Sequence, residues 1–452
     1  MRIALVCGCL LSLFACSSPI TPRPPADLSI QTRAVSSAAL FGAPRPFAPE
    51  RSNAQIAQDI LALGFRLESG RELPVFSRFE GPVSLRLSGQ IPPLAAIETE
   101  RLLSRMRTEA GLEIRQVTSG PAQIVVEFVP QATMQRLVPG ASCFVLPNVS
   151  SWDTFRAAPR ARALDWAEVV TRKKALVIAP ADSTIQEMRD CLHEEVAQAL
   201  GPLNDLYRIG ETVWNDDNFQ TSLTGFDMLV LKVWYHPSLR PGMRKDEVAA
   251  RLPAILSDLN PSGDRNNDVP PDPTPTPRAW VDAIEDALNA TSRRSSFRQA
   301  QNALRIASEE GWRDERLAFS LFVAARFAPP GQGIAALDAL AKASALYGAR
   351  PGGAVPRAHV NLHLAAQALG AGQNALVLRL TQSAIEPAQR TENGALLASL
   401  MLLRAEALEG MGQLAEAERL RRDAVPFAIF GFGSQQAADD RRSEIAALRS
   451  GQ

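Results

Sequence analysis

After its first residues, the 452-residue chain has no hydrophobic run long enough to cross a bilayer as a helix. It also has no excess of charge of either sign, because 48 basic residues balance 48 acidic ones and the pI is about 6.9. Neither nucleic acid nor an acidic membrane surface is therefore favoured as a partner. The mature chain has no Ser/His/Asp arrangement, Gly-rich phosphate loop or redox CxxC motif, which excludes the enzyme classes that depend on them.

The beginning of the chain matches a bacterial lipoprotein precursor. Arg2 precedes an apolar run, residues 3–14, that is too short for a permanent membrane helix. Leu13-Phe14-Ala15-Cys16 then fits the lipobox, in which a small residue precedes a Cys whose thiol receives a diacylglycerol. The pattern predicts export and a lipid anchor on Cys16, and Ser17 favours the outer membrane, facing the periplasm. The alternative is an ordinary secretory signal that is cut near the same place.

The cysteine count agrees with export. Cys7 and Cys9 leave with the signal, and Cys16 carries lipid, so that Cys143 and Cys191 remain. An even pair in an oxidising compartment predicts a disulfide bond between Cys143 and Cys191, and the alternative is two buried free thiols.

The length suggests two or three domains. Two Pro-rich stretches divide the chain, and no helix or strand is expected to cross the second of them. We therefore predict a signal peptide over 1–16, a flexible tether over 17–50, a domain over 51–259, a Pro/Asp-rich linker over 260–277 and a last domain over 278–452.

The middle domain alternates between helical and strand patterns, which predicts an α+β fold. Ser183 is the expected cap of a helix that ends at Leu200, before Gly201-Pro202. The other expected helices cover 53–67, 94–110 and 226–234, and the expected strands cover 83–87, 112–117, 124–128, 143–146 and 175–179.

The last domain is predicted to be all-α, with tetratricopeptide-like helical repeats. Pairs of small residues seven apart recur at intervals of roughly 40 residues. Small side chains let the helices of a hairpin approach closely, and a stack of hairpins offers a groove for a protein partner. The alternative is an unrelated Ala-rich bundle. The pairs are Ala300/Ala307, Ala336/Ala343, Val377/Ala384 and Ala417/Ala424, and the last copy adds Ala405, Leu408 and Gly412.

The predicted helix that ends at Leu200 carries the outline of a zinc-protease motif. His193-Glu194 opens an H-E-x-x-H frame, but no second His follows at the required spacing. A better frame is the longer metzincin motif, H-E-x-x-H-x-x-G-x-x-H. In that frame the general base is Glu195, the turning glycine is Gly201, and the zinc positions hold Glu194, Gln198 and Asn204.

The spacing of this second frame fits, but its chemistry does not. Zinc prefers imidazole, thiolate and carboxylate ligands, so that one Glu with two amides would bind it weakly. Without the metal, no water is activated for peptide hydrolysis. The pattern indicates a zincin-like scaffold that has lost its zinc site, and the alternative is an amphipathic helix with an accidental Glu-Glu pair.

Two blocks of sequence resemble a known family. The segment EEVAQALGPLND, residues 194–205, and the segment from Glu211 to Met243 are similar to the domain of unknown function 2927, a family of proteobacterial putative lipoproteins. The resemblance covers residues 50 to 250. The zincin-like character of this domain is inferred from the metzincin spacing above, and the family resemblance implies no activity, because the family has none that can be transferred.

Other candidate site residues lie near the motif. They are His193, Asp205 at the end of the first block, and the loop residues Asp216 and Asp217. The run Asn215–Asn218 has oxygen ligands suited to Ca²⁺, but it lacks the spacing of an EF-hand, so that a solvated or capping loop is the favoured interpretation.

Two functions follow from these patterns. The favoured one is a lipid-anchored envelope protein that binds or scaffolds other proteins without catalysis, with no metal or cofactor assigned. The alternative is a metal-dependent peptidase with an unusual ligand set and Glu195 as general base, in which zinc is the candidate metal.

Overall fold

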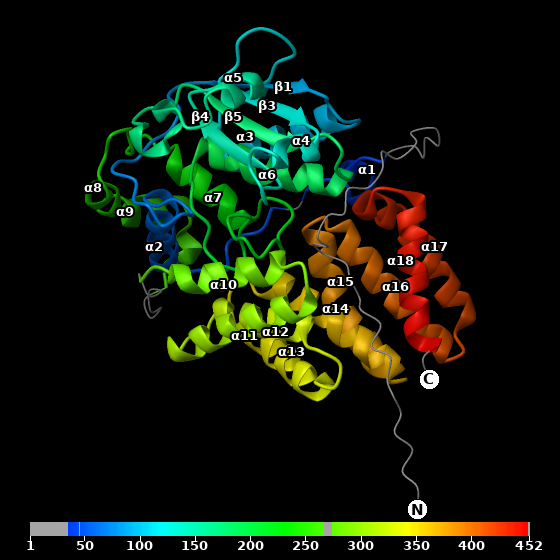
Figure 1. Cartoon of the computed structure of the whole chain (residues 1–452). Coiled ribbons are helices and arrows are strands. Elements are labelled where there is room, and N and C mark those ends of the chain that lie inside the picture. The colour runs from blue at the N-terminus through cyan, green and yellow to red at the C-terminus, as the bar shows by residue number, and fades with distance from the viewer. Residues whose placement is uncertain (1–34, 45, 266–273, 451–452) are drawn as a thin grey trace, which may run out of the picture. The chain divides into compact units, whose positions relative to one another are not determined.

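The computed structural model describes residues 35–44, 46–265 and 274–450 (Figure 1). Within these residues the chain forms two compact units. The first comprises residues up to 276 together with Arg390–Glu392, and the second comprises 277–389 and the residues after 392. The predicted signal peptide and the lipid-anchor residue Cys16 lie outside the described residues.

A five-stranded mixed sheet forms the centre of the first unit, and its strand order is β2-β1-β3-β5-β4. Neighbouring strands are parallel, except that the edge strand β4 runs antiparallel to β5. All six residues of β5 are buried, as expected of a central strand covered on both faces. The strands are β1 (Val83–Gly89), β2 (Ile114–Gln116), β3 (Ile124–Val129), β4 (Phe144–Pro147) and β5 (Ala175–Pro180).

Alternation along the strands sends side chains to two unequal cores. Val126 and Val177 pack with the long helices α2, α3, α6 and α7 on one face of the sheet. Val125 and Leu176 face a smaller core with Trp152 and Phe155 on the other face. The helices of this unit are α1 (Ser37–Phe41), α2 (Asn53–Gly64), α3 (Ala95–Ala110), α4 (Gln131–Gln135), α5 (Trp152–Ala157), α6 (Ile185–Leu200), α7 (Gly225–Trp234), α8 (Lys245–Ala249) and α9 (Leu252–Leu259), and 3₁₀ turns cover Arg162–Leu164, Trp166–Glu168 and Pro261–Gly263.

The predicted α+β fold is confirmed, and the expected helices and strands are present with shifts of a few residues at their ends. The predicted cap of the motif helix is wrong by one residue. Thr184, not Ser183, accepts a hydrogen bond from the Glu187 N–H, and the Glu187 carboxylate accepts one from the Thr184 N–H in return. Ser183 instead donates its hydroxyl to the Pro180 carbonyl oxygen. Both residues are good caps in sequence, and the Glu three positions later selects the second one.

The predicted domain boundaries are also corrected. The flexible tether predicted over 17–50 does not extend as far as residue 50, because Ser36 caps α1 and Ser37 is buried against Glu98. At the other end the domain continues past 259, where the Asn53 side chain donates to the Asn260 carbonyl and to Asp264. These polar segments belong to the domain because buried polar side chains of the domain, such as Glu98 and Asn53, form hydrogen bonds with them.

The second unit is wholly helical, as predicted. Helices alternate along four hairpins and end with a single helix, in agreement with a helical-repeat domain. The helices are α10 (Arg278–Asn289), α11 (Arg293–Glu309), α12 (Glu315–Phe327), α13 (Gly333–Gly348), α14 (Ala354–Gly370), α15 (Asn374–Arg390), α16 (Gly394–Gly410), α17 (Leu414–Phe432) and α18 (Gln435–Ser450).

The small-residue pairs occupy the second helix of each hairpin, namely α11, α13, α15 and α17. Seven of their eight members are buried, and Ala336 is the exception. In the last hairpin, Ala405, Leu408 and Ala417 share one buried cluster, and Gly412 turns the chain with φ +79°. The sequence pattern thus marks the positions where helices of the repeat meet.

A glycine inside α17 permits a close approach between helices. A Cβ on Gly431 would lie 2.3 Å from the Ala395 amide nitrogen in α16 and 2.7 Å from the Ala395 Cβ. Gly431 lies in the last turn of α17, which continues as far as Phe432, and only Gly433, with φ +86°, leaves the helix.

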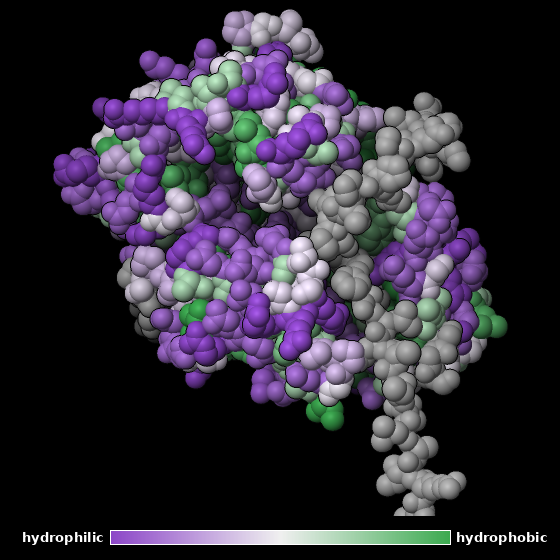
Figure 2. All heavy atoms as spheres, viewed as in Figure 1, coloured by the Kyte–Doolittle hydropathy of each residue, from purple (hydrophilic) through white to green (hydrophobic). Residues whose placement is uncertain are grey.

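Hydrophilic side chains predominate on the face seen in Figure 2, with apolar residues in small separate groups. Few large apolar side chains in the described residues are well exposed. They are Ile91, Ile97, Val170, Ile334, Leu337, Met411 and Leu414. Among the described helices, none has the length and apolar character needed to span a membrane.

Candidate functional site

The motif helix α6 is held at both ends and at its middle. The Thr184 capping box fixes its first turn. At its other end, Arg172 donates to the carbonyl oxygens of Gln198 and Ala199, at 2.7 and 2.8 Å. Cys191, in the second turn, forms the predicted disulfide bond with Cys143. The helix therefore presents its side chains from a fixed position.

Arg172 is a structural residue that sequence reasoning missed. It is nearly fully buried, and burial lowers its pKa to about 10. Its guanidinium group also bonds to the Gly201 carbonyl and lies 4.8 Å from the Trp166 ring centroid. A cation at the C-terminus of a helix is favoured by the partial negative charge of the last carbonyl groups.

The three zinc positions of the metzincin frame do not form a zinc site. Glu194 and Gln198 lie one turn apart on α6. Asn204, however, donates its side-chain amide to the Ala62 carbonyl in α2 at 3.0 Å. Among the described residues, no group of three or more His, Cys, Asp or Glu side chains is arranged to hold a metal ion. The donor set of one carboxylate and two amides does not fit zinc.

Gly201 ends α6, as predicted, with φ −144°. A Cβ at this position would make ordinary contact with Leu231 and Trp234 of α7, at 3.4 and 3.6 Å. The turn after the helix therefore does not depend on a left-handed glycine, in contrast to the common helix ending.

His193 is bonded to the loop before α7 and has a structural role. Its Nδ1 atom accepts a hydrogen bond from the Leu223 N–H at 2.9 Å. Burial lowers the pKa of His193 well below its usual value, and the guanidinium groups of Arg189, Arg105 and Arg101 lower it further. His193 is therefore neutral, and the loop before α7 occupies the nitrogen that a metal would need.

A group of interacting carboxyls, which we call the acidic cluster, includes Asp190, Glu194 and Glu195 of α6 together with Glu68, Asp205 and Asp216. Burial raises the pKa of Glu194, Glu195 and Asp205 well above the usual range, and the neighbouring carboxyls raise each of them further. Glu195 is only 4% exposed, and its Oε2 atom is buried with no hydrogen-bond partner. Burial and mutual repulsion therefore both favour the protonated form of these carboxyls.

The structure brings Glu194, Glu195, Asp205 and Asp216 together, as four of the predicted candidates, and adds two residues that were not predicted. Asp190 lies one turn before Glu194, so that helical spacing could have identified it. Glu68 follows α2, far away in sequence, and no local signal marks it. A carboxyl group kept protonated can donate a hydrogen bond or a proton, which an ionised one cannot.

Asp217 forms hydrogen bonds within its own loop. Its carboxylate accepts hydrogen bonds from the Asn215 side chain at 2.8 Å and from the Phe219 N–H at 3.0 Å. The Asn215 side chain also donates to the Ile209 carbonyl. The Asp217 carboxylate therefore stabilises the loop conformation, in agreement with the capping interpretation of this segment.

Comparison with known proteins identifies one family. Residues 53–254, which cover most of the α+β unit, match the family described as "Protein of unknown function (DUF2927)". This agrees with the resemblance found in the two sequence blocks. No curated protein and no solved structure matches the chain.

Proposed function

We propose that this chain, in which residues 53–254 belong to the DUF2927 family, is a lipid-anchored cell-envelope protein that binds other molecules without zinc catalysis. Its α+β domain would be a zincin-like scaffold used for binding. The observation that carries the proposal is the Asn204 amide, which donates to Ala62 at a position where a zinc protease needs a ligand. Amide side chains stand at two of the three ligand positions, in place of the imidazole groups that zinc prefers.

The metal content of the exported protein tests this proposal. Mature full-length protein, purified without chelators and supplied with zinc, is expected to hold far less than one zinc per chain. It is also expected not to cleave a peptide library. The matched control is Glu195→Gln, because a real protease would lose cleavage in this variant. Stoichiometric zinc together with Glu195-dependent cleavage would refute the proposal.

A second candidate function is a metal-dependent peptidase with Glu195 as general base. The observation that favours it is the buried Oε2 atom of Glu195, which has no hydrogen-bond partner beside other carboxyls. Burial disfavours the ionised form of Glu195 that a general base needs, so that this function needs a cation whose charge ionises the acidic cluster. Oxygen ligands suit Ca²⁺ or Mn²⁺ better than zinc. Proton release on addition of either ion, lost in Glu195→Gln, would favour it.

Membrane attachment through Cys16 is tested separately. We expect the wild-type chain to incorporate labelled palmitate and to sediment with outer membranes, because the acyl chains partition into the bilayer. Cys16→Ser should lose both properties. Cys9→Ser, within the same predicted signal, is the matched control and should keep them. Label on Cys16→Ser would contradict the proposed anchor.

The helical repeats are proposed to bind a protein of the envelope. Stacked hairpins present a groove, and the small-residue pairs in α11, α15 and α17 are buried, which leaves the other faces of these helices for contacts. Capture of envelope proteins with the lipidated chain, compared with Cys16→Ser, would identify a partner that needs membrane attachment. A protein retained equally by unrelated lipoproteins would not count as a partner.

A further inference from the structure

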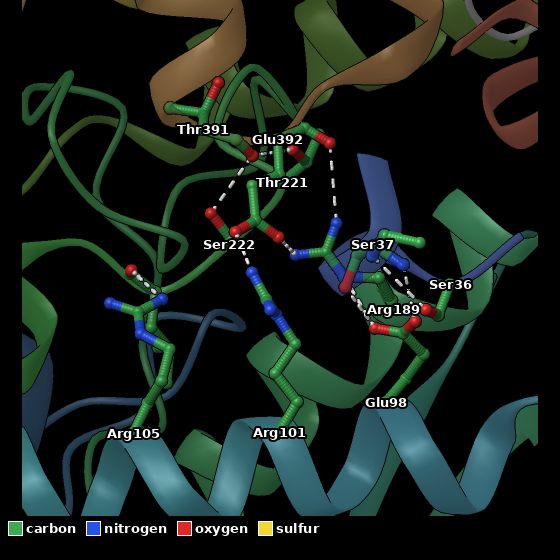
Figure 3. A network of polar contacts seen from close by, with 12 residues as sticks. Ser36, Ser37, Glu98, Arg101, Arg105, Arg189, Thr221, Ser222, Thr391 and Glu392 are labelled. Carbon is green, nitrogen blue, oxygen red and sulfur yellow. Dashed lines mark hydrogen bonds and ion pairs between the residues drawn. The ribbon is translucent and has the colours of Figure 1, made fainter. Parts of the chain in front are cut away.

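A second polar centre lies on the side of α6 that carries His193. Arg189, on α6, and Arg101, on α3, both direct their guanidinium groups to the carboxylate of Glu392 (Figure 3). Arg101 Nη2 lies 2.5 Å from Glu392 Oε1, and Arg189 Nη2 lies 2.8 Å from Oε2. The side chains of Arg189 and Glu392 are 2% and 10% exposed. The pair is therefore largely removed from water.

The charges of this centre balance only when Glu392 is included. Arg189 also faces Glu98, with 3.5 Å between Nε and Oε2, and Glu98 accepts hydrogen bonds from the N–H and the hydroxyl of Ser37 (Figure 3). Two guanidinium groups thus face two carboxylates. If Glu392 were absent, one positive charge would remain buried without compensation, which is strongly unfavourable.

The residues before Glu392 are bound as well. The Thr391 carbonyl oxygen accepts hydrogen bonds from the hydroxyls of Thr221 and Ser222, at 2.8 and 3.1 Å. The Arg390 guanidinium lies 4.7 Å from the Phe47 ring centroid. Three consecutive residues therefore each make a contact of a different kind: cation–π, main-chain carbonyl and carboxylate.

The backbone of Glu392 is held in an unfavourable conformation. Its φ is +55°, in the left-handed region that residues other than Gly, Asn and Asp rarely adopt. A glycine would adopt this turn at no steric cost. The carboxylate that this side chain places between the two arginines gives a physical reason for a glutamate at this position.

We propose that Arg101, Arg189, Thr221 and Ser222 form a carboxylate pocket, which recognises a peptide glutamate together with the main-chain carbonyl before it, and that Arg390–Glu392 is its built-in occupant. These three residues count with the α+β unit, although Arg390 is the last residue of α15 and the other two directly follow that helix. The carboxylate pocket shares no residue with the acidic cluster and does not depend on the proposed function.

The loop that contacts the occupant of the carboxylate pocket also contacts the motif helix α6. Thr221 and Ser222 directly precede Leu223, whose N–H bonds to His193 on α6 and whose carbonyl oxygen accepts from Arg105 at 2.9 Å. The same short loop thus contacts the occupant on one side and α6 on the other. Loss of the occupant is expected to loosen this loop and the support of His193.

Chemical rescue in the full-length mature protein tests the proposal. Glu392→Ala deletes about the volume of one acetate, so that acetate should bind between the two arginines and raise the melting temperature of this variant. The increase should exceed that produced by chloride at equal ionic strength and should grow with the logarithm of acetate concentration. Wild type, with the pocket filled, should respond equally to both salts.

Two controls make the rescue specific. Glu386→Ala removes an exposed carboxylate from α15, and acetate should not act differently from chloride on it. Arg189→Met combined with Glu392→Ala should lose the acetate effect. If acetate and chloride act alike on Glu392→Ala, or if the double variant keeps the rescue, the pocket does not exist as proposed. If Glu392→Ala is unfolded in chloride, refolding in acetate but not in chloride supports the proposal, and failure in both overturns it.

Discussion

Loss of the Cys143–Cys191 disulfide bond should destabilise the α+β domain by about 4 kcal/mol. The bond joins the residue before β4 to the motif helix and closes a loop with a sequence separation of 48. The chain-entropy relation for a loop of this length gives roughly 14 cal/mol/K, which at room temperature is about 4 kcal/mol of unfolding free energy. The effect arises because the cross-link removes conformations from the unfolded chain.

The measurement is urea unfolding of the oxidised mature protein and of Cys143→Ala, Cys191→Ala and the double variant. Tryptophan fluorescence reports mainly on the α+β unit, which contains four of the six tryptophans. Each single variant already breaks the bond, so that both singles and the double should lose nearly the same free energy. Alkylation of the unfolded wild type should find neither cysteine as a free thiol.

Additive single-variant losses would refute this reasoning, because two independent buried thiols add while two halves of one bond do not. A double variant that loses less than about 1 kcal/mol would refute the loop-closure argument as well. Either result would also weaken the inference that the chain matures in an oxidising compartment.

Three further changes have defined outcomes. Gly431→Ala should destabilise the helical domain by about 1–3 kcal/mol in thermal unfolding, because its Cβ would overlap Ala395, whereas Gly370→Ala, with only an ordinary contact at 3.7 Å, should be neutral or stabilising. Asp59→Asn should cost about 3–5 kcal/mol in urea unfolding, because it leaves two buried arginines without their carboxylate, and a loss below 1 kcal/mol would contradict this. Burial raises the pKa of Glu211 from 4.5 to about 7, so that the folded state holds its proton more tightly and stability from this group is lost as pH rises from about 4.5 through 7. In Glu211→Gln, the decrease in unfolding free energy across this pH range, measured by urea unfolding, should be smaller by about 3 kcal/mol. If the pH dependence of the variant equals that of the wild type, Glu211 does not cause the decrease.

Local patterns predicted the elements of the fold well. Strand β5 could be recognised because a run of apolar residues that favour strands ends at a turn. The motif helix could be recognised because its apolar residues follow a residue suited to capping a helix. The small-residue pairs of the repeat domain were informative because helix packing places a strict limit on side-chain size. Each of these signals lies within one element.

The candidate site was predicted less completely, because its geometry depends on contacts between distant residues. The spacing of Glu194, Gln198 and Asn204 could not show that Asn204 bonds to Ala62, which is 142 residues away. Glu68 joins the acidic cluster from another helix end. The Arg101–Glu392 contact spans 291 residues, and neither residue stands in a recognisable motif.

The membership of Arg390–Glu392 in the α+β unit has a consequence for how this protein can be divided. A truncation placed in the predicted linker at 260–277 keeps every residue of the DUF2927 match, 53–254, yet omits the partner of two nearly buried guanidinium groups. Gene boundaries drawn from sequence similarity would therefore yield a fragment with one excess buried positive charge. A designed single-domain version should restore that charge balance, for example by Arg101→Met, or carry the three-residue segment on a new turn.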